Sequence, residues 1–347
     1  MTSPFHYKEI ISAAPDAMAI AMGVRVPHPH PLATGLTLKE IAHAHGMLKA
    51  NGRNMDNPNA SIALGLAMGD FSAALATGAQ NLSISAFVSQ AQHAAFCSIV
   101  PTKDFKPVDP QILDGYAGLD LEFVGELGEI GYGEVHVAST LDTARLVRYA
   151  RIIGLTRKEI YNDTVGNFSR LLVRLGASAA RLEARLVADA LNINPVMTDG
   201  QTIFDLSGAD SKNNVLPLTI SPANLGLAMT KLRNQVSASG GRADLAARHL
   251  VVSSELEFTA CKLVKETGLN IDVHALAYLP ADRWFLLCDP MIQPVIGTLR
   301  LDDEPTVLRI KAVSRRPDGN DGAAVRIVAD LGATMISRIG VVRGGAL

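Results

Sequence analysis

The sequence predicts an α+β fold, in which helices and antiparallel strands occupy separate stretches of the chain. Three observations carry this prediction. A long uninterrupted helix is expected over residues 165–191, and a glycine-rich stretch with alternating apolar residues at 107–144 favours a β-hairpin. Short strands then follow at 249–253, 272–279, 284–288, 307–313 and 324–329.

The predicted helix at 165–191 contains no proline. Asp163 or Thr164 can cap its start, because their side-chain oxygens accept hydrogen bonds from the free amides of the first turn. The asparagines and proline within 192–195 end it. At about 1.5 Å per residue it would be about 40 Å long, well beyond the three turns usual in a globular domain.

This helix has two distinct faces. An apolar stripe is formed by Phe168, Leu172, Leu175, Ala179, Leu182, Leu186 and Ala190. A basic stripe, within an arc of about 60°, is formed by Arg170, Arg174, Arg181 and Arg185. The simplest interpretation of the basic stripe is a solvated helix face; the alternative is a surface that meets DNA phosphates.

Shorter helices are expected elsewhere. Thr37 and Glu40 form a capping box for a helix ending near Ala50. Further helices are predicted at 60–78, 82–100, 221–239 and 254–266. Residues 1–36 are rich in proline, and we expect an irregular, extended arm. If the chain assembles with copies of itself, the arm (1–60) and the loop (116–150) are expected to make most of their contacts outside their own subunit.

The hairpin stretch 107–144 is strongly acidic. It has no lysine or arginine, and its carboxylates are Asp109, Asp114, Asp120, Glu122, Glu126, Glu129, Glu134 and Asp142. Residues 145–185 carry nine basic residues against three acidic ones. If the chain assembles with copies of itself, we expect the hairpin to dock on a basic surface of an adjacent subunit, with these candidate contacts: Asp120, Glu122, Glu126, Glu129 and Glu134.

Composition limits the function. The chain has 347 residues, 48% of them hydrophobic, and a net charge of -2, which does not favour nucleic acid or membrane as a general partner. The three cysteines are scattered, and the four histidines between residues 28 and 45 lack a further ligand that would favour a metal site. No nucleophile elbow, phosphate-binding loop or zinc-protease motif is present, so we expect neither an enzyme nor a cofactor.

Several segments, taken in order, resemble the major capsid proteins of tailed bacteriophages with the Hong Kong 97-type fold, in particular the capsid part of prohead protease fusions. The segments are DFSAALA (70–76), TKDFKPV (102–108), VGELGEIGYGEV (124–135), LTRKEIYNDTVGNF (155–168), LNINPVMTDGQTIFD (191–205), RHLVVSSELEFTACKLV (248–264) and VRIVADLGATMISRIG (325–340). Some relatives cross-link through a loop lysine; here no lysine lies between Lys106 and Lys158, so that chemistry is not expected.

The resemblance implies a domain plan. It comprises an N-terminal arm (1–60), a peripheral domain that begins at 61–115, an extended hairpin loop (116–150), the rest of the peripheral domain with its spine helix (151–238, helix 165–191), an axial domain (239–303) and return strands (304–347).

The resemblance also implies a function. The chain would self-assemble into hexamers and pentamers of an icosahedral head that encloses double-stranded DNA without sequence specificity. Further partners would be a portal, a scaffold or protease, and decoration proteins, but no membrane. The protein would belong to the virion and assemble in the host cytoplasm. An encapsulin-like nanocompartment enclosing protein cargo is the alternative, and a maturation protease is a weaker one.

Overall fold

The computed structural model describes residues 4–21, 26–50, 62, 69–107, 111–113, 137–139, 144–156, 158, 165–197, 200–206, 213–236, 241–302, 307–313 and 322–345. The chain divides into two compact units, each assembled from three chain segments. The first unit comprises Met1–Ala91, Arg148–Arg181 and Glu304–Asp330, and the second comprises Gln92–Val147, Leu182–Asp303 and Leu331–Leu347. The predicted α+β class is confirmed by the elements described below.

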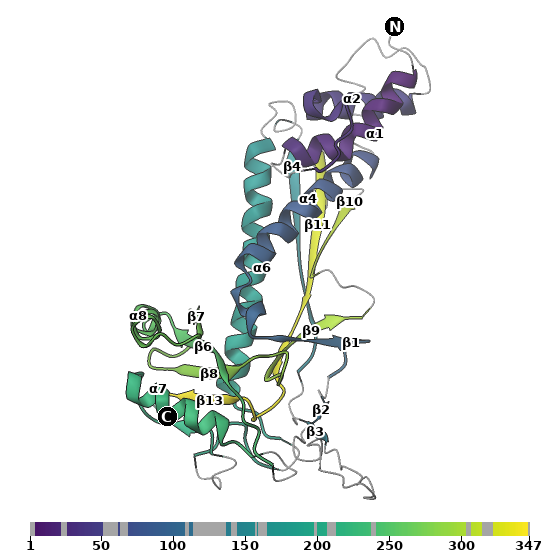
Figure 1. Cartoon of the computed structure of the whole chain (residues 1–347). Helices are drawn as coiled ribbons and strands as arrows, with labels where there is room; N and C mark the ends of the chain where they lie inside the picture. The colour runs from purple at the N-terminus through teal and green to yellow at the C-terminus, as the bar shows by residue number, and fades with distance from the viewer. Residues whose placement is uncertain are drawn as a thin grey trace, which may run out of the picture. The chain divides into compact units, whose positions relative to one another are not determined.

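The first unit packs helices on a small sheet. Its helices are α1 (Pro4–Ala21), a 3₁₀ turn η1 (Ala33–Gly35), α2 (Leu38–Lys49), α4 (Gly69–Gln90) and the first part of α6 (Val165–Ile193). Its sheet has the order β10-β11-β4, from strands β10 (Leu308–Val313), β11 (Gly322–Leu331) and β4 (Val147–Thr156). Helix α4 contacts β10, and α1 contacts both α2 and α4 (Figure 1).

The second unit is built on two sheets. A three-stranded sheet has the order β1-β9-β12, from β1 (Ser98–Thr102), β9 (Ile296–Leu301) and β12 (Ala333–Met335). A five-stranded sheet has the order β5-β13-β8-β6-β7, from β5 (Val215–Leu216), β13 (Val341–Gly344), β8 (Trp284–Cys288), β6 (Ala247–Ser253) and β7 (Asp272–Leu276). A 3₁₀ turn η2 (Gln92–Ala95) precedes β1, and the helices α7 (Pro222–Arg233) and α8 (Glu257–Thr267) contact β13 and β6–β7 respectively (Figure 1).

Strand β8 supplies the centre of the second unit's core. All five of its residues are buried, and Trp284 and Phe285 have no exposed surface. The indole nitrogen of Trp284 donates to the carbonyl oxygen of Leu218 at 3.1 Å, so the ring is buried without losing its hydrogen bond. The strand predicted at 284–288 is confirmed.

The long helix is confirmed and runs two residues further than predicted, to Ile193. Asn194 ends it by adopting a left-handed conformation (φ 51°), which the short side chain of asparagine tolerates, and Pro195 follows. The buried stripe matches the predicted one only in part. Leu172 and Ala190 are buried as predicted, and the other buried positions among the described residues of the helix are Gly176, Ala180, Glu183, Val187, Ala188 and Leu191. Four of these six carry a small residue or a carboxylate, which a hydropathy pattern does not select.

The prediction of an extended arm is wrong over Pro4–Ala21, because this segment forms helix α1 despite an internal proline at Pro15. The helix buries Ala13, Ala14 and Met18, and its neighbours α2 and α4 belong to the same chain. This apolar burial outweighs the local preference of proline for extended chain. Helix α1 thus has packing partners within its own chain, and its contacts with other subunits stay a prediction. The capping box of α2 is confirmed in both directions.

Other boundaries also differ from the prediction. Residues 69–90 form one helix rather than two, and 98–102 are a strand. Helix α8 begins at Glu257, three residues later than predicted, and ends at Gly268 in a left-handed conformation (φ 64°). The base of the predicted hairpin is present, since β2 (Gln111–Leu113) pairs antiparallel with β3 (Val137–Ser139).

Candidate assembly surfaces

The basic stripe of α6 is exposed. Arg170, Arg174, Arg181 and Arg185 all lie on the accessible side of the helix. At about 100° per residue, this side is opposite the buried stripe. Arg185 is already engaged, since it pairs with Asp189 at 3.8 Å and its guanidinium lies 5.7 Å from the ring centre of Tyr278. Among the described residues, no acidic side chain pairs with the other three, so they remain available to an external anion.

The acidic hairpin loop is the predicted partner of a basic surface. The five candidate loop contacts, Asp120, Glu122, Glu126, Glu129 and Glu134, lie outside the described residues. The structure fixes only the two short strands β2 and β3, which flank them in the sequence. Loop docking therefore stays a prediction.

The sheet of the first unit carries a second basic surface. Arg148 on β4 makes a two-pronged contact with Asp330 on β11, at 2.9 Å from Nε to Oδ1 and 3.2 Å from Nη2 to Oδ2. Arg309 on β10 also binds Asp330 through Oδ2. The Asp330 side chain is 6% exposed, so one buried carboxylate holds two guanidinium groups from the two flanking strands.

Lys311 and Arg326 continue this surface. They are directly opposite each other in the antiparallel pair of β10 and β11, and both are exposed. Like charges that face each other across two strands destabilise a sheet unless an anion lies between them or over them. No acidic partner of either is found in the part of the chain that the structure describes. We call Arg148, Arg309, Lys311 and Arg326 the basic sheet face.

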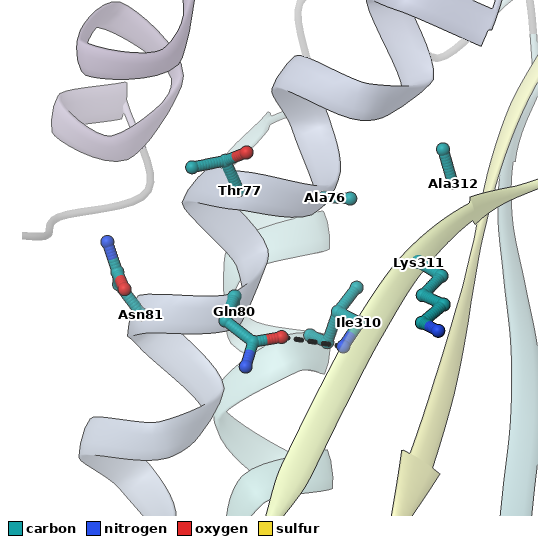
Figure 2. A pocket seen from close by; sticks show the side chains of 7 residues that line it. All are labelled: Ala76, Thr77, Gln80, Asn81, Ile310, Lys311 and Ala312. Carbon is teal, nitrogen blue, oxygen red and sulfur yellow. Dashed lines mark hydrogen bonds between the residues drawn. The ribbon is translucent and has the colours of Figure 1, made fainter. Parts of the chain in front are cut away.

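A shallow pocket lies beside the same strand. It is lined by Ala76, Thr77, Gln80, Asn81, Ile310, Lys311 and Ala312 (Figure 2). Gln80 reaches from α4 to β10, where its carboxamide oxygen accepts from the Ile310 amide at 2.6 Å (Figure 2). The carboxamide nitrogen of Gln80 donates to the Leu308 carbonyl at 2.7 Å. The carboxamide thus satisfies the open edge of β10 as a neighbouring strand would. The lining combines apolar, hydroxyl and carboxamide side chains with Lys311, and it holds no histidine, cysteine or carboxylate.

A buried charged cluster lies inside the second unit. Glu183 on α6 binds His93 (Nε2 to Oε2, 2.8 Å) and Arg300 on β9, and its side chain is fully buried. Burial by itself raises the pKa of Glu183, but hydrogen bonds from His93 and Arg300 outweigh it, so the carboxyl pKa lies below its ordinary value. Nearby, burial and then the Glu183 carboxylate raise the pKa of Cys97 well above its ordinary range, so this thiol stays protonated and is not an activated nucleophile.

Neither a metal centre nor a membrane segment is found among the described residues. No three histidine, cysteine or acidic side chains there are grouped to hold a metal ion. Instead, Nδ1 of His30 accepts a hydrogen bond from the Leu32 amide, and the ring of His43 lies against the ring of Tyr7. No helix in this part of the chain is both long and apolar enough to cross a bilayer.

Sequence reasoning found the basic stripe of α6 but missed the basic sheet face. The missed signal is present in the alternation of charged and apolar residues in β10 and in β11 around Arg326. The pairing register, which brings Lys311 opposite Arg326, cannot be obtained from one sequence.

Comparison with known proteins identifies the family. A family model described as phage capsid protein matches residues 140–344, which is more than half of the chain. This chain belongs to that phage capsid protein family. The resemblance to phage capsid proteins stated from the sequence is thereby confirmed.

Solved structures similar to this capsid protein include shells of several kinds. They include a virus-like particle from Pyrococcus furiosus (11% identity, 76% of this chain and 96% of that chain, TM-score 0.46). They also include the capsid of cyanophage P-SCSP1u (9%, 74% and 88%, TM-score 0.42) and the holo-SrpI encapsulin complex of Synechococcus elongatus PCC 7942 (7%, 73% and 86%, TM-score 0.47). No curated protein sequence matches this capsid protein.

Proposed function

We propose that this capsid protein is the major capsid protein of a tailed phage, with the Hong Kong 97-type fold, and that it self-assembles into hexamers and pentamers of an icosahedral head around double-stranded DNA. Membership of the phage capsid family is the observation that carries the proposal. The chain would then be a structural protein of the virion rather than an enzyme, assembled in the host cytoplasm. A portal, a scaffold or protease, and decoration proteins would be its further partners.

The domain plan from the sequence is kept as part of this proposal. The spine helix is α6, and the axial domain, residues 239–303, falls within the second unit. The extended loop, residues 116–150, contains the acidic segment and ends within the first residues of β4. The arm, residues 1–60, includes α1 and α2.

We further propose that the acidic loop of one subunit docks on the basic sheet face of its neighbour. Charge complementarity supports this assignment: the loop segment has carboxylates and no cations, while Lys311 and Arg326 lie exposed and opposite each other without an acidic partner among the described residues. Such contacts set orientation and suppress wrong encounters more than they add affinity.

Charge reversal tests this docking. Glu126→Lys with Glu129→Lys should remove most of the shell yield, since like charges would then meet at the interface. Adding Lys311→Glu with Arg326→Glu should restore shells, and exposed Lys265→Glu on α8 is the matched control without an effect. Shell yield is read by sedimentation and electron microscopy at low and high salt. Equal shell yields from the loop variant and the unchanged protein would contradict loop docking.

The exposed stripe on α6 supports a different role, binding of DNA phosphates inside the head. Arg174→Gln with Arg181→Gln should leave shells intact but reduce the DNA that is protected from nuclease, because these contacts contribute charge without sequence preference. Glutamine at Arg185, which Asp189 and Tyr278 already engage, should have a smaller effect. Unchanged DNA retention in the double variant would assign the stripe to solvent.

A nanocompartment shell is the second candidate, and the contents of the particle separate it from a phage head. Particles recovered from the cells that naturally produce the protein should contain nuclease-protected double-stranded DNA. Particles that instead contain one enriched protein and no DNA would support the compartment.

A further inference from the structure

Two histidines form a direct contact between neighbouring strands of the five-stranded sheet. Strands β6 and β7 are parallel, and their register places Val251 opposite His274 and His249 opposite Asp272. The Nδ1 atom of His249 lies 3.1 Å from the Nε2 atom of His274. Sequence analysis did not single out this pair, because its members are 25 residues apart.

The aromatic ring of Phe96 lies next to both histidine rings. His249 is 6% exposed, and the ring centre of Phe96 lies 6.5 Å from that of His249 and 5.2 Å from that of His274. A hydrogen bond between two imidazoles needs one protonated nitrogen and one free lone pair. If both rings are charged, two N–H groups face each other, so the bond is lost and the positive charges repel.

The surrounding charges do not neutralise a doubly protonated pair. Asp272 on β7 and Asp289 after β8 favour protonation, while Arg248 on β6 opposes it. The Asp272 carboxylate is also shared with Arg248, at 3.3 Å. Helix α8 buries only apolar side chains in the core, and its charged residues are exposed; those residues are Glu257, Lys262, Lys265 and Glu266.

Burial sets the direction of titration. It lowers the pKa of both histidines below the ordinary value, and the charge of His249 lowers that of His274 further. Both rings are therefore neutral near pH 7. Because the folded pKa values are below the unfolded ones, stability is complete above the unfolded pKa of about 6.5 and is lost as the pH falls toward the folded values.

Strand β7 is the element most easily released by this loss. It lies at the edge of the sheet and is paired only with β6 among the strands described. Edge elements open with a smaller free energy than central strands such as β8. The sheet can therefore lose β7 while β13, β8 and β6 stay paired.

We propose that the contact between His249 and His274 makes the attachment of β7 to β6 sensitive to acid, so that β7 separates from the sheet when both rings are protonated. The central strands keep their core through Trp284 and Phe285. The sensitivity is a property of the second unit of each chain, so the proposal does not rest on shell assembly.

Hydrogen exchange of the full-length protein at about pH 7.5 and about pH 5, corrected for the intrinsic pH dependence of exchange, tests the proposal. Amides of 272–276 should lose protection by about tenfold for each pH unit and each proton taken up, whereas amides of β8 should not. Replacing His249→Asn with His274→Gln keeps amide groups near both contact atoms but removes the titration, so acid should no longer release β7. The control is His28→Gln, an exposed histidine of the first unit, which should respond like the unchanged protein.

Two results would overturn the proposal. One is an unchanged acid response in the double variant, which would assign the response to other groups. The other is that acid lowers the protection of β7 and β8 equally, or lowers it in neither strand. This second test needs only the unchanged protein, so it applies even when the variant does not fold.

Discussion

Glu183 is the residue on which the interior of the second unit depends most directly. Its carboxylate is fully buried on α6, and it holds both His93 and Arg300, whose side chain is only 13% exposed. A buried charge is tolerated when it is paired, but removing one partner leaves the other charge without compensation. The cluster therefore fixes η2, the second part of α6 and β9 to one another within this unit.

Replacing Glu183→Gln should lower the free energy of unfolding by roughly 3–5 kcal/mol, because Arg300 would stay buried without an anion. Urea denaturation of the purified chain measures the effect. Arg185→Gln on the same helix removes only contacts of an exposed side chain, with Asp189 and with the Tyr278 ring, and should change stability little. A loss for Glu183→Gln no larger than that of the control would show that Arg300 finds water or another partner.

The pH dependence of Glu183 has a definite sign. Its folded pKa is below the unfolded value of about 4.3, so its contribution is fully present above that value and is lost as the pH falls through the folded pKa. In Glu183→Gln this acid dependence should disappear, whereas the effect of His249 and His274, which begins at higher pH, should remain.

At the scale of elements, the close approach of α4 to α6 within the first unit depends on Gly176. A Cβ atom at this position would lie 2.2 Å from the backbone oxygen of Ser83, which no side-chain adjustment relieves. The hydroxyl of Ser83 also donates to the Leu172 carbonyl at 3.3 Å, so a short side chain of α4 reaches the backbone of α6. Glycine is tolerated inside this long helix because it permits this contact.

Gly176→Ala should therefore destabilise the protein by about 1–3 kcal/mol through overpacking, although alanine favours the helix by about 1 kcal/mol. The matched control is Gly226→Ala in α7, where nothing lies within 4 Å of the added methyl group and a gain of up to about 1 kcal/mol is expected. Thermal or urea unfolding distinguishes them. A stabilising Gly176→Ala would mean that α4 and α6 separate at little cost.

Local patterns predicted some elements well and others poorly for physical reasons. The α6 helix, the capping box of α2 and the buried strand β8 follow from periodicity, caps and β-branched or aromatic content, all of which are local. Helix α1 was missed because tertiary burial of its alanines outweighs Pro15. Strands β1 and β9 were missed because their parallel pairing joins residues about 200 positions apart.

The candidate sites show the same division. The exposed arginines of α6 could be predicted from helical spacing, since spacing alone decides which side chains share a face. The burial of Glu183 could not be predicted from local spacing, because Arg300 and His93, which make it possible, come from distant parts of the sequence. The pairs of Lys311 with Arg326 and of His249 with His274 depend on strand register, which no local pattern contains.

At the scale of the whole molecule, the chain separates its charges along the sequence while staying nearly neutral. Residues 107–144 contain aspartate and glutamate but no lysine or arginine, and exposed cations lie on α6 and on the basic sheet face. A monomer has no need for this separation, whereas repeated contacts between copies can use it to set register. Self-assembly is therefore the central claim for this phage capsid protein.

Electron microscopy of the purified full-length chain, at micromolar concentration and moderate salt, tests this claim most directly. If the chain self-assembles as proposed, we expect closed shells of uniform size in which hexamers and pentamers are resolved. Monodisperse monomers or small oligomers over the whole range of concentration and salt would contradict it.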